Sequence, residues 1–268
     1  MSPILLIGAG RMGSALLKGW VARGIGPVLV VEPAPSAELT AFAGTHRIAL
    51  FKSATTIDTL RARACVVALK PQILKGEMTA LRAIAGSGAA MVSIAAGTTI
   101  AAMRQAWGQD ARIVRAMPNT PGAIGRGITA LHAATGVTAK DKRLAEALLA
   151  ALGQTVWVPR ESDIDVVTAV SGSGPAYVFL LVEALADAAQ AEGLPRPLAE
   201  KLARATITGA GALLDADPSA PLALRRAVTS PHGTTEAALK ILMARNGLAP
   251  LMRRAVGAAR KRARELGK

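Results

Sequence analysis

The stretch Ser171-Gly172-Ser173-Gly174-Pro175-Ala176-Tyr177 opens a long apolar helix in the second half of the chain. Serine and glycine are common just before a helix, and proline is tolerated in the first turn because its missing N–H would have no partner there. From Ala176 to about Glu192 nearly every residue is apolar, and the few polar residues form one narrow stripe. This pattern predicts a helix buried on almost all sides, as the centre of an all-helical domain or of a dimer.

Near the N-terminus, a glycine-rich turn stands between a strand and a helix. Pro3–Ile7 is a short apolar strand, Gly8-Ala9-Gly10-Arg11-Met12-Gly13 follows it directly, and Ser14–Val21 is an apolar helix. In this setting G-x-G-x-x-G is typical of a dinucleotide-binding turn: one glycine makes the turn, one lets the pyrophosphate approach, and one lets the helix pack on the strand. A glycine-rich turn with a purely structural role is the alternative.

The next strand, Val28–Val31, ends at Glu32, which lies 19 residues after Gly13. An acidic residue at this point usually bonds the hydroxyls of the adenine ribose and repels a 2′-phosphate. Glu32 therefore favours NADH, and a solvent-exposed acid at a strand end is the alternative.

Six further strands are predicted, and helical segments alternate with most of them, as a parallel sheet requires. They are Ile48–Leu50, Ala64–Leu69, Met91–Ala95, Arg112–Met117, Gly127–His132 and Thr155–Val158. From about Glu161 only helices are expected, near residues 161–170, 175–192, 195–214, 219–228, 235–245 and 248–266. We predict an α/β N-terminal Rossmann-like domain with a parallel-sheet core, residues 1–159, and an all-α C-terminal dimerisation domain, residues 160–268.

Three loops carry polar groups. Lys70-Pro71-Gln72 places a cation at the carboxyl edge of the sheet, and Met117–Gly122 is a stiff loop that offers the amide of Asn119. In both cases an ordinary proline-initiated turn is the alternative. Val228–Thr235 leads into a helix that Thr234 or Thr235 can cap, and its hydroxyls and free N–H groups predict an anion pocket suited to a carboxylate. A capped turn without a ligand is the alternative there.

Composition limits the classes of protein. The 268 residues are 51% hydrophobic, enough for one large domain or two modest ones. The single cysteine, Cys65, lies in an apolar strand, allows no internal disulfide and suits a reducing cytoplasm. Met1–Gly8 has no basic region and is too short for a secretion signal. The uncharged stretch Ala83–Met103 is interrupted by glycines, so we expect a helix end, a buried strand and a helix start rather than a membrane span.

The net charge of +14 raises the question of nucleic-acid or membrane binding, since Leu251–Lys268 carries seven basic residues and one acidic residue. Aromatic residues make up only 3%, and the basic residues alternate with alanines at helical spacing. We therefore expect a solvated helix face, and neither a membrane nor nucleic acid as partner. The sequence has no G-x-S-x-G, P-loop, paired cysteines or H-x-x-H motif, so neither a metal site nor a nucleophilic mechanism is expected.

Six segments together resemble the pyrroline-5-carboxylate reductase family, which catalyses the last step of proline synthesis. They are Gly8–Gly13, Ala68–Gln72, Ser93–Gly97, Met117–Pro121, Ser171–Tyr177 and Val228–Thr235. Related imine or hydroxyacid reductases share five of them in part, whereas S-G-S-G-P-A-Y combined with T-S-P-x-G-T-T is highly specific to this family.

The resemblance implies a Rossmann domain and a helical domain that interlocks with a second subunit, with each active site at that interface. The expected cofactor residues are Ile7, Gly8, Ala9, Gly10, Arg11, Met12, Gly13, Ala68, Leu69, Lys70, Pro71, Ile94, Ala95 and Ala96, together with Glu32 and Asn119 from the strand ends. The resemblance also implies that Ser230, Thr234 and Thr235 hold the substrate, with Glu161 nearby.

One position departs from the family pattern, because the family usually has glycine where this chain has His232. If that glycine needs a positive φ or lets the substrate approach, a histidine is strained or crowds the site. The family also usually prefers NADPH, whereas Glu32 favours NADH, so the expected cofactor is NADPH or NADH.

The expected activity is reduction of 1-pyrroline-5-carboxylate to L-proline by hydride transfer to the cyclic imine, in a cytoplasmic homodimer or larger homo-oligomer. We expect the Thr235 hydroxyl to bond the imine nitrogen, and Ser230 with the N–H groups of Gly233 and Thr234 to hold the carboxylate. Tyr177 and His232 are the nearby candidates for a proton donor, and solvent can also serve. Two alternatives stay open: a reductase of another cyclic imine, such as the six-membered homologue, and a nucleotide-sensing or basic binding protein without turnover.

Overall fold

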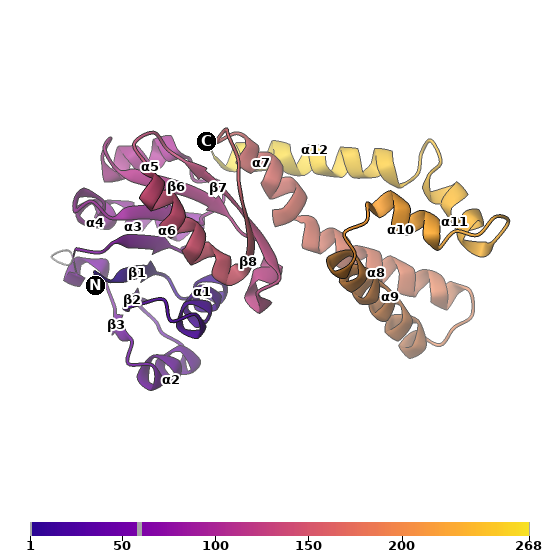
Figure 1. Ribbon diagram of the computed structural model, residues 1–268, viewed down its shortest axis with the longest axis horizontal. Coiled ribbons are helices and arrows are strands. Elements are labelled where there is room, and N and C mark those ends of the chain that lie inside the picture. Colours follow the sequence, from indigo (N-terminus) through magenta and orange to yellow (C-terminus); the bar gives the residue numbers. More distant parts are fainter. Residues whose placement is uncertain (1, 58–60, 268) are drawn as a thin grey trace. The chain divides into compact units, whose positions relative to one another are not determined.

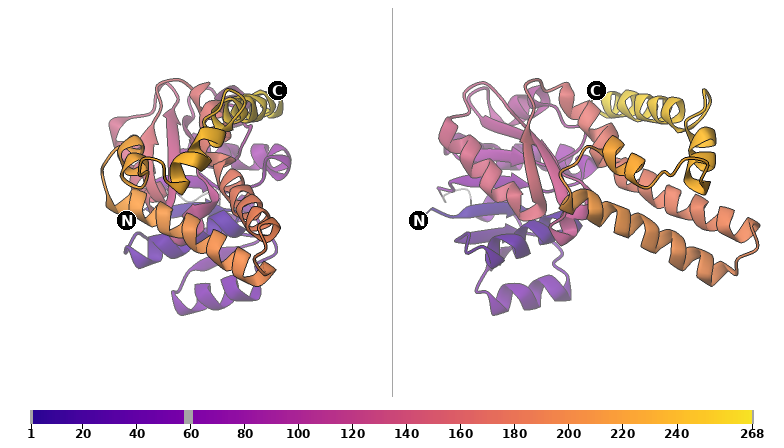
Figure 2. Two further views of the ribbon diagram at one scale, coloured as in Figure 1. Left: turned by 90° about the vertical axis from the view of Figure 1, so that its right-hand side faces the viewer. Right: turned by 45° about the vertical axis from the view of Figure 1, so that its right-hand side comes forward.

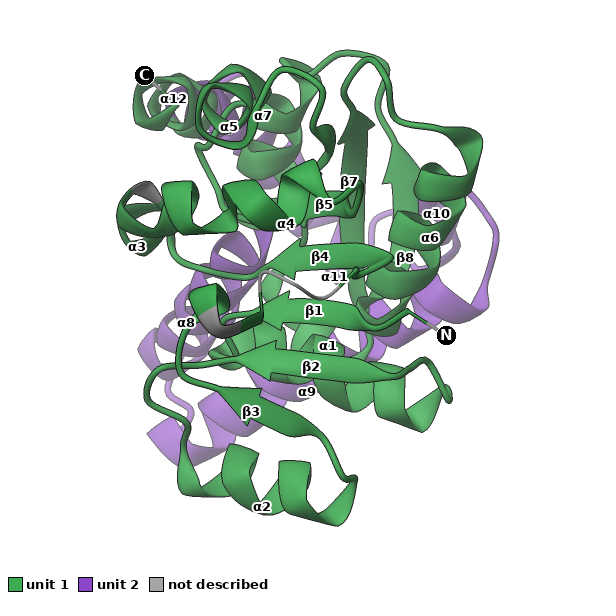
Figure 3. Ribbon diagram, turned by 90° about the vertical axis from the view of Figure 1, so that its left-hand side faces the viewer, with its two compact units in different colours: residues 1–173, 259–268 green, residues 174–258 purple. Residues whose placement is uncertain are grey.

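The computed structural model describes residues 2–57 and 61–267, and the chain separates into two compact units (Figure 1). Unit 1 comprises Met1–Ser173 and Ala259–Lys268, and unit 2 comprises Gly174–Ala258 (Figure 3). The sequence places the domain boundary near Pro159, whereas the compact units divide after Ser173. The difference arises because Ile164 and Ala169, in the first helical segment after the boundary, are buried within unit 1.

Unit 1 is built on a sheet whose eight described strands follow the order β3-β2-β1-β4-β5-β6-β7-β8. Their bounds are β1 (Ile4–Ile7), β2 (Val28–Val31), β3 (Ala49–Phe51), β4 (Ala64–Val67), β5 (Ala90–Ser93), β6 (Arg112–Met117), β7 (Gly127–Ala133) and β8 (Gly153–Trp157). Figure 3 shows the first five of these strands stacked in that order. The predicted α/β class and parallel-sheet core are confirmed, and each predicted strand forms with small shifts at its ends.

One strand pair breaks the parallel pattern, since β7 runs antiparallel to β6. The short 3-10 turn η3 (Thr120–Ile124) joins them, and Gly125 closes it in the left-handed region at φ 71°. A parallel connection would need a crossover of a dozen or more residues, which this loop does not provide. β8 then pairs parallel with β7.

Helices cover both faces of the sheet, because successive strand residues point to opposite sides. On one face, Leu5 and Val67 share a buried cluster with residues of α3 (Pro71–Glu77), α4 (Arg82–Gly86), α5 (Ile100–Trp107), η1 (Ala54–Ile57) and η2 (Met78–Leu81). On the other face, Leu6 and Val66 pack with α1 (Arg11–Ala22), α2 (Ala37–Thr45), α6 (Ala139–Leu149) and η4 (Ala150–Leu152). The uncharged stretch 83–103 is divided among α4, buried β5 and α5, as predicted.

Cys65 lies in the centre of β4 and is fully buried. Burial raises the pKa of its thiol to about 12, because the thiolate would lose its hydration. The interpretation of Cys65 as an unreactive strand residue is therefore supported by its surroundings.

Two short helical segments end the main part of unit 1, namely α7 (Asp163–Val167) and the π-helical turn η5 (Thr168–Gly172). The chain returns to this unit at its C-terminus, where Ala263 is buried and the Arg264 Nε atom lies 3.8 Å from Asp165 Oδ2. Exposed Arg260 and Lys261 face solvent, in keeping with the expected solvated face.

Among the residues that the structure describes, unit 2 consists of helices and their connecting turns, with no strand. It comprises α8 (Gly174–Ala191), α9 (Arg196–Ala216), α10 (Pro221–Ala227), α11 (Thr234–Leu242) and the first part of α12 (Leu248–Leu266). Helices α8 and α9 lie side by side (Figure 2) and bury small residues, Ala186, Ala199 and Ala203, between neighbouring elements. Arg196 strengthens the α8–α9 connection by pairing with Asp187 of the first helix.

The prediction that α8 is buried on almost all sides is wrong for a single chain. Phe179 is 60% exposed, Leu180 63% and Leu181 47%, because α9 covers only one side of the helix. A row of large apolar side chains left in water is typical of an interaction surface. The helical stretch Asp163–Ala191 is also long enough and apolar enough to cross a membrane, but one such helix is only weak evidence for a membrane span.

Candidate active site

The glycine-rich turn between β1 and α1 has the geometry that a bound dinucleotide requires. Gly8 has φ +88°, a conformation that side chains rarely adopt. A Cβ atom on Gly13 would lie 2.1 Å from the carbonyl oxygen of Gly8, so helix and strand approach closely at this glycine. Around Gly10 the hypothetical Cβ meets no atom within 4 Å, which leaves open space in front of the first turn of α1. The backbone thus has a tight turn at Gly8, close helix packing at Gly13 and open space at Gly10.

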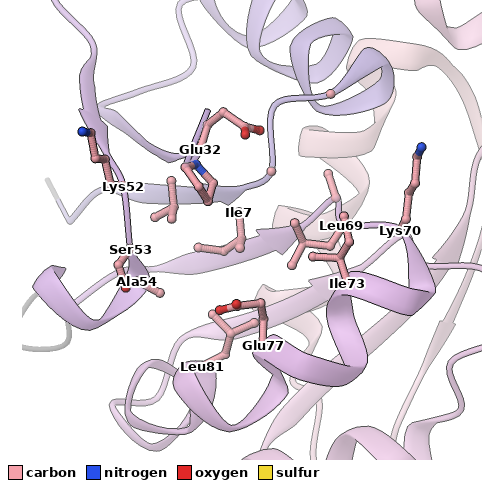
Figure 4. Close-up of a pocket in the computed structure, with 15 residues that line it drawn as sticks. Ile7, Glu32, Lys52, Ser53, Ala54, Leu69, Lys70, Ile73, Glu77 and Leu81 are labelled. Atoms are coloured by element: carbon pink, nitrogen blue, oxygen red, sulfur yellow. The ribbon is translucent and has the colours of Figure 1, made fainter. Parts of the chain in front are cut away.

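A pocket of about 420 Å³ extends from this turn past the carboxyl ends of β1, β2 and β4 (Figure 4). Glu32 lines it, and its carboxylate is turned toward the glycine-rich turn, where Oε2 accepts the N–H of Ala9 at 2.8 Å. The other carboxylate oxygen, Oε1, accepts the N–H of Ala34 at 3.3 Å. Glu32 is therefore an anchored acceptor at the rim of the pocket and not an unattached surface acid.

The first pocket also contains residues that sequence reasoning missed, namely Lys52, Ser53, Ile73, Glu77 and Leu81. Lys52 and Ser53 follow β3 directly, so the rule that polar residues after a parallel strand face the ligand edge would have found them. Ile73 and Leu81 come from α3 and η2, whose approach to the pocket has no signal in the sequence.

A second pocket of about 340 Å³ shares Gly10 and Ala68–Lys70 with the first. Arg11 and Lys70 both line it, and no ion pair is formed by either side chain within residues 2–57 and 61–267. Two cations beside a helix N-terminus make a favourable place for a pyrophosphate. Pro71 is the first residue of α3, so the ordinary proline-initiated turn is present here as well.

The two pockets account for most of the expected cofactor residues. Those that line at least one of them are Ile7, Gly8, Gly10, Arg11, Met12, Glu32, Ala68, Leu69, Lys70, Pro71, Ile94, Ala95 and Ala96. Ala9 and Gly13 take part through the backbone of the turn.

Asn119 has a different role in the structure. Its side-chain oxygen accepts the N–H of Ile128 at 3.0 Å and so holds the start of β7, and the residue lines neither of the two pockets. Met117 and Pro118, from the same loop, line the second pocket instead. Met117 and Pro118 are thus the residues of this loop that line the two pockets, while the cofactor role of Asn119 stays a prediction.

Glu161 lies in a charged cluster of unit 1. Its Oε1 atom accepts both the N–H of Ile100, at the start of α5, and a bond from Nη1 of buried Arg115 at 2.9 Å. Asp165 adds a second carboxylate 3.6 Å from Nη2 of Arg115. These contacts neutralise a buried guanidinium and cap a helix, so they give Glu161 a structural role that the sequence does not reveal.

The turn that precedes α11 lies in unit 2. Gly233 is the N-cap of α11, and no side chain caps the helix, so the prediction that Thr234 or Thr235 is the cap is wrong. The two threonines occupy the first turn, whose N–H groups lack partners within the helix. The N–H of Gly233 already donates to the carbonyl of Ser230 at 3.1 Å, so it is not a donor for a substrate carboxylate.

Ser230 and His232 complete this turn. A Cβ atom on Gly233 would lie 2.4 Å from Ser230 Oγ, which shows how closely the serine hydroxyl packs over the glycine. His232 has φ +60°, so the concern raised by the sequence is confirmed: this position does use the left-handed region. Its N–H donates to Oε2 of Glu236 at 2.6 Å.

Comparison with known proteins finds a matching family model in each half of the chain and relatives that match nearly its whole length. A family model described as pyrroline-5-carboxylate reductase dimerisation matches residues 161–266, and a model described as NADP oxidoreductase, coenzyme F420-dependent, matches residues 3–97. A pyrroline-5-carboxylate reductase from Pseudomonas aeruginosa is 40% identical over 264 residues, with 98% of this chain and 96% of the relative covered. The enzyme of that name from Arabidopsis thaliana is 37% identical, with 97% and 94% covered.

Solved structures agree with these relatives. A pyrroline-5-carboxylate reductase from Coxiella burnetii superposes with a TM-score of 0.92 at 37% identity, covering 100% of this chain and 99% of the other. A Plasmodium falciparum pyrroline carboxylate reductase with NADP bound has a TM-score of 0.83 at 27% identity, with 100% and 98% covered. The chain therefore belongs to the pyrroline-5-carboxylate reductase family.

Proposed function

We propose that the protein reduces 1-pyrroline-5-carboxylate to L-proline with NADPH or NADH, the last step of proline biosynthesis. The observation that carries the proposal is the near full-length identity to enzymes of this name from bacteria and plants. The two joined pockets at the carboxyl edge of the sheet support it independently, because a dinucleotide fits the open space at Gly10 and the cations beside it.

In this proposal the chain's own residues hold the cofactor in an extended form across the two pockets. The first-turn amides of α1, with Arg11 and Lys70, bind the pyrophosphate, and Glu32 bonds the adenine ribose. Ile94–Ala96 and Met117 enclose the nicotinamide end. The bound cofactor supplies a hydride, and the protein supplies orientation and exclusion of water.

The substrate is held by the turn before α11. The Ser230 hydroxyl and the first-turn amides of Thr234 and Thr235 bind the carboxylate, because the amide of Gly233 is already engaged. The Thr235 hydroxyl bonds the imine nitrogen. A protonated imine is already electrophilic, so correct placement contributes most of the rate enhancement.

We further propose a homo-oligomer with the dimer as its minimum unit, located in the cytoplasm, with neither a membrane nor nucleic acid as partner. The exposed apolar row of Phe179, Leu180 and Leu181 supports the dimer, since a second chain would remove these side chains from water. The family model that matches residues 161–266 is named for dimerisation.

The decisive experiment measures oxidation of NADPH and NADH by the purified protein with and without pyrroline-5-carboxylate, and with a six-membered cyclic imine as competitor. Thr235→Ala should lower kcat by about ten- to a hundredfold, as expected for a lost hydrogen bond to a charged partner of about 1.5–3 kcal/mol. Thr235→Ser keeps the oxygen and should retain most activity. Ser230→Ala should instead raise KM, since a carboxylate contact is made in both ground and transition states. No substrate-dependent oxidation would refute the proposed activity, whereas wild-type kinetics for both Thr235→Ala and Ser230→Ala would refute the proposed substrate turn.

A further inference from the structure

The backbone of the substrate turn is unusual at His232. Its φ of +60° puts the backbone of a residue with a large ring side chain in the left-handed region, where glycine is the favoured residue. Within the described residues, Arg47 is the other non-glycine residue with positive φ, and it lies in unit 1. A conformation of this kind persists only when surrounding contacts hold it.

Glu236 supplies such a contact. Its Oε2 atom accepts the N–H of His232 at 2.6 Å, while Nζ of Lys240 lies 3.6 Å from the other oxygen, Oε1. Glu236 is the third residue of α11, and a carboxylate in the first turn also interacts favourably with the helix dipole. In the usual capping box this third residue bonds the N-cap amide, whereas here it reaches one residue further back.

The hydrogen bond from His232 to Glu236 ties the turn that carries Ser230 to the helix that carries Thr235. Ser230 belongs to the turn, and its hydroxyl packs over Gly233 so closely that a Cβ atom there would be 2.4 Å away. Thr235 belongs to α11 itself. If His232 relaxed to negative φ, Ser230 would move relative to the helix, whereas Thr235 would stay within its first turn.

We propose that Glu236 is a positioning residue that holds the substrate turn in the left-handed conformation at His232. It thereby keeps the Ser230 hydroxyl at a fixed position relative to Thr235, without itself touching the substrate. The inference rests on the proposed function of this turn, because it assigns a support to the same site.

The test uses the full chain and varies pyrroline-5-carboxylate at saturating cofactor. Glu236→Ala should raise KM for the substrate by about tenfold, as expected for a lost hydrogen bond to a charged group, and change kcat by less than about threefold. Glu236→Gln keeps a side-chain oxygen and should stay within about threefold of wild type. Lys240→Ala is the matched control: it removes the other partner of Glu236 and should leave KM unchanged.

The critical comparison is a double-mutant cycle that combines Glu236→Ala with His232→Gly. Glycine adopts positive φ without strain, so His232→Gly should keep the wild-type KM for pyrroline-5-carboxylate, whatever the imidazole contributes to kcat. Adding Glu236→Ala to it should raise that KM by less than about threefold. The proposal is overturned if Glu236→Ala leaves KM unchanged, or if its defect is equally large in the glycine background. Should Glu236→Ala alone fail to fold, the comparison of His232→Gly with the double variant still decides. Wild-type kinetics for Ser230→Ala and Thr235→Ala would refute the proposed site itself, which is a different outcome.

Discussion

Gly10 offers the sharpest test of the dinucleotide site, because the structure separates its effect on folding from its effect on binding. A Cβ atom built there meets nothing within 4 Å, and its backbone, at φ −64° and ψ −165°, lies in the extended region that alanine also adopts. Gly10→Ala should therefore fold normally. The added methyl group would occupy the space in front of α1 that the pyrophosphate is proposed to enter.

The magnitudes follow from these contacts. Alanine reduces the freedom of the unfolded chain, which stabilises by about 0.4–1 kcal/mol, but it is a poorer N-cap than glycine by a similar amount. The net change in the free energy of unfolding should be within about 1 kcal/mol. Displacing a charged phosphate from even one amide removes a hydrogen bond of about 1.5–3 kcal/mol, so the Kd for NADPH should rise about ten- to a hundredfold.

Gly153→Ala is the matched control, which should lower the stability of the fold and leave NADPH binding unchanged. Gly153 has φ +128°, and a Cβ atom there would lie 2.2 Å from the carbonyl oxygen of Gly127, in a part of the sheet that lines neither cofactor pocket. Strain and overpacking should destabilise by about 2–5 kcal/mol, while the folded fraction binds normally. Thermal unfolding and titration of bound NADPH fluorescence measure both quantities. If Gly10→Ala binds NADPH like wild type, the pyrophosphate does not approach this glycine.

Three further predictions test other parts of the molecule. Glu32→Ser should raise kcat/KM for NADPH relative to NADH by about tenfold, roughly 1.4 kcal/mol, and an unchanged ratio would mean that the carboxylate does not face the ribose. Leu180→Asp should give a monomer or a destabilised chain in sedimentation experiments, because it would bury an unpaired charge at the proposed dimer contact. Glu192→Gln, one residue after the end of α8, is the control. A stable, active Leu180→Asp dimer would exclude that contact. Cys65, whose thiol pKa is raised to about 12 by burial, should resist alkylation in the native protein at pH 8 and react once unfolded, so rapid native labelling would contradict the buried placement.

Much of unit 1 was predictable because its signals are local. Short apolar strands separated by helices indicated the sheet, and the glycine pattern between β1 and α1 indicated the dinucleotide turn, since each depends on residues close together in the chain. The conformational concern at His232, in unit 2, came instead from the resemblance to a family that usually has glycine there, and its φ of +60° confirms a left-handed backbone. Glu32 was predictable at the ligand-facing edge of the sheet as well, because it directly follows a strand and the carboxyl ends of parallel strands share that edge.

Only the tertiary structure decided which partner each side chain meets. From the sequence alone, an amide or carboxylate shortly after a strand is predicted to face a ligand. In the structure, Asn119 accepts a hydrogen bond from Ile128 and Glu161 accepts one from Arg115. These bonds form because a buried donor is costly to leave without an acceptor.

The apolar pattern of α8 likewise indicates burial without saying by which chain. In the single chain its large side chains are exposed, and α9 covers one side only. The return of the C-terminus to unit 1 and the bond from His232 to Glu236 have no periodic signal either. Periodicity reports which side of an element avoids water, whereas the identity of the covering surface depends on contacts made only after the chain has folded.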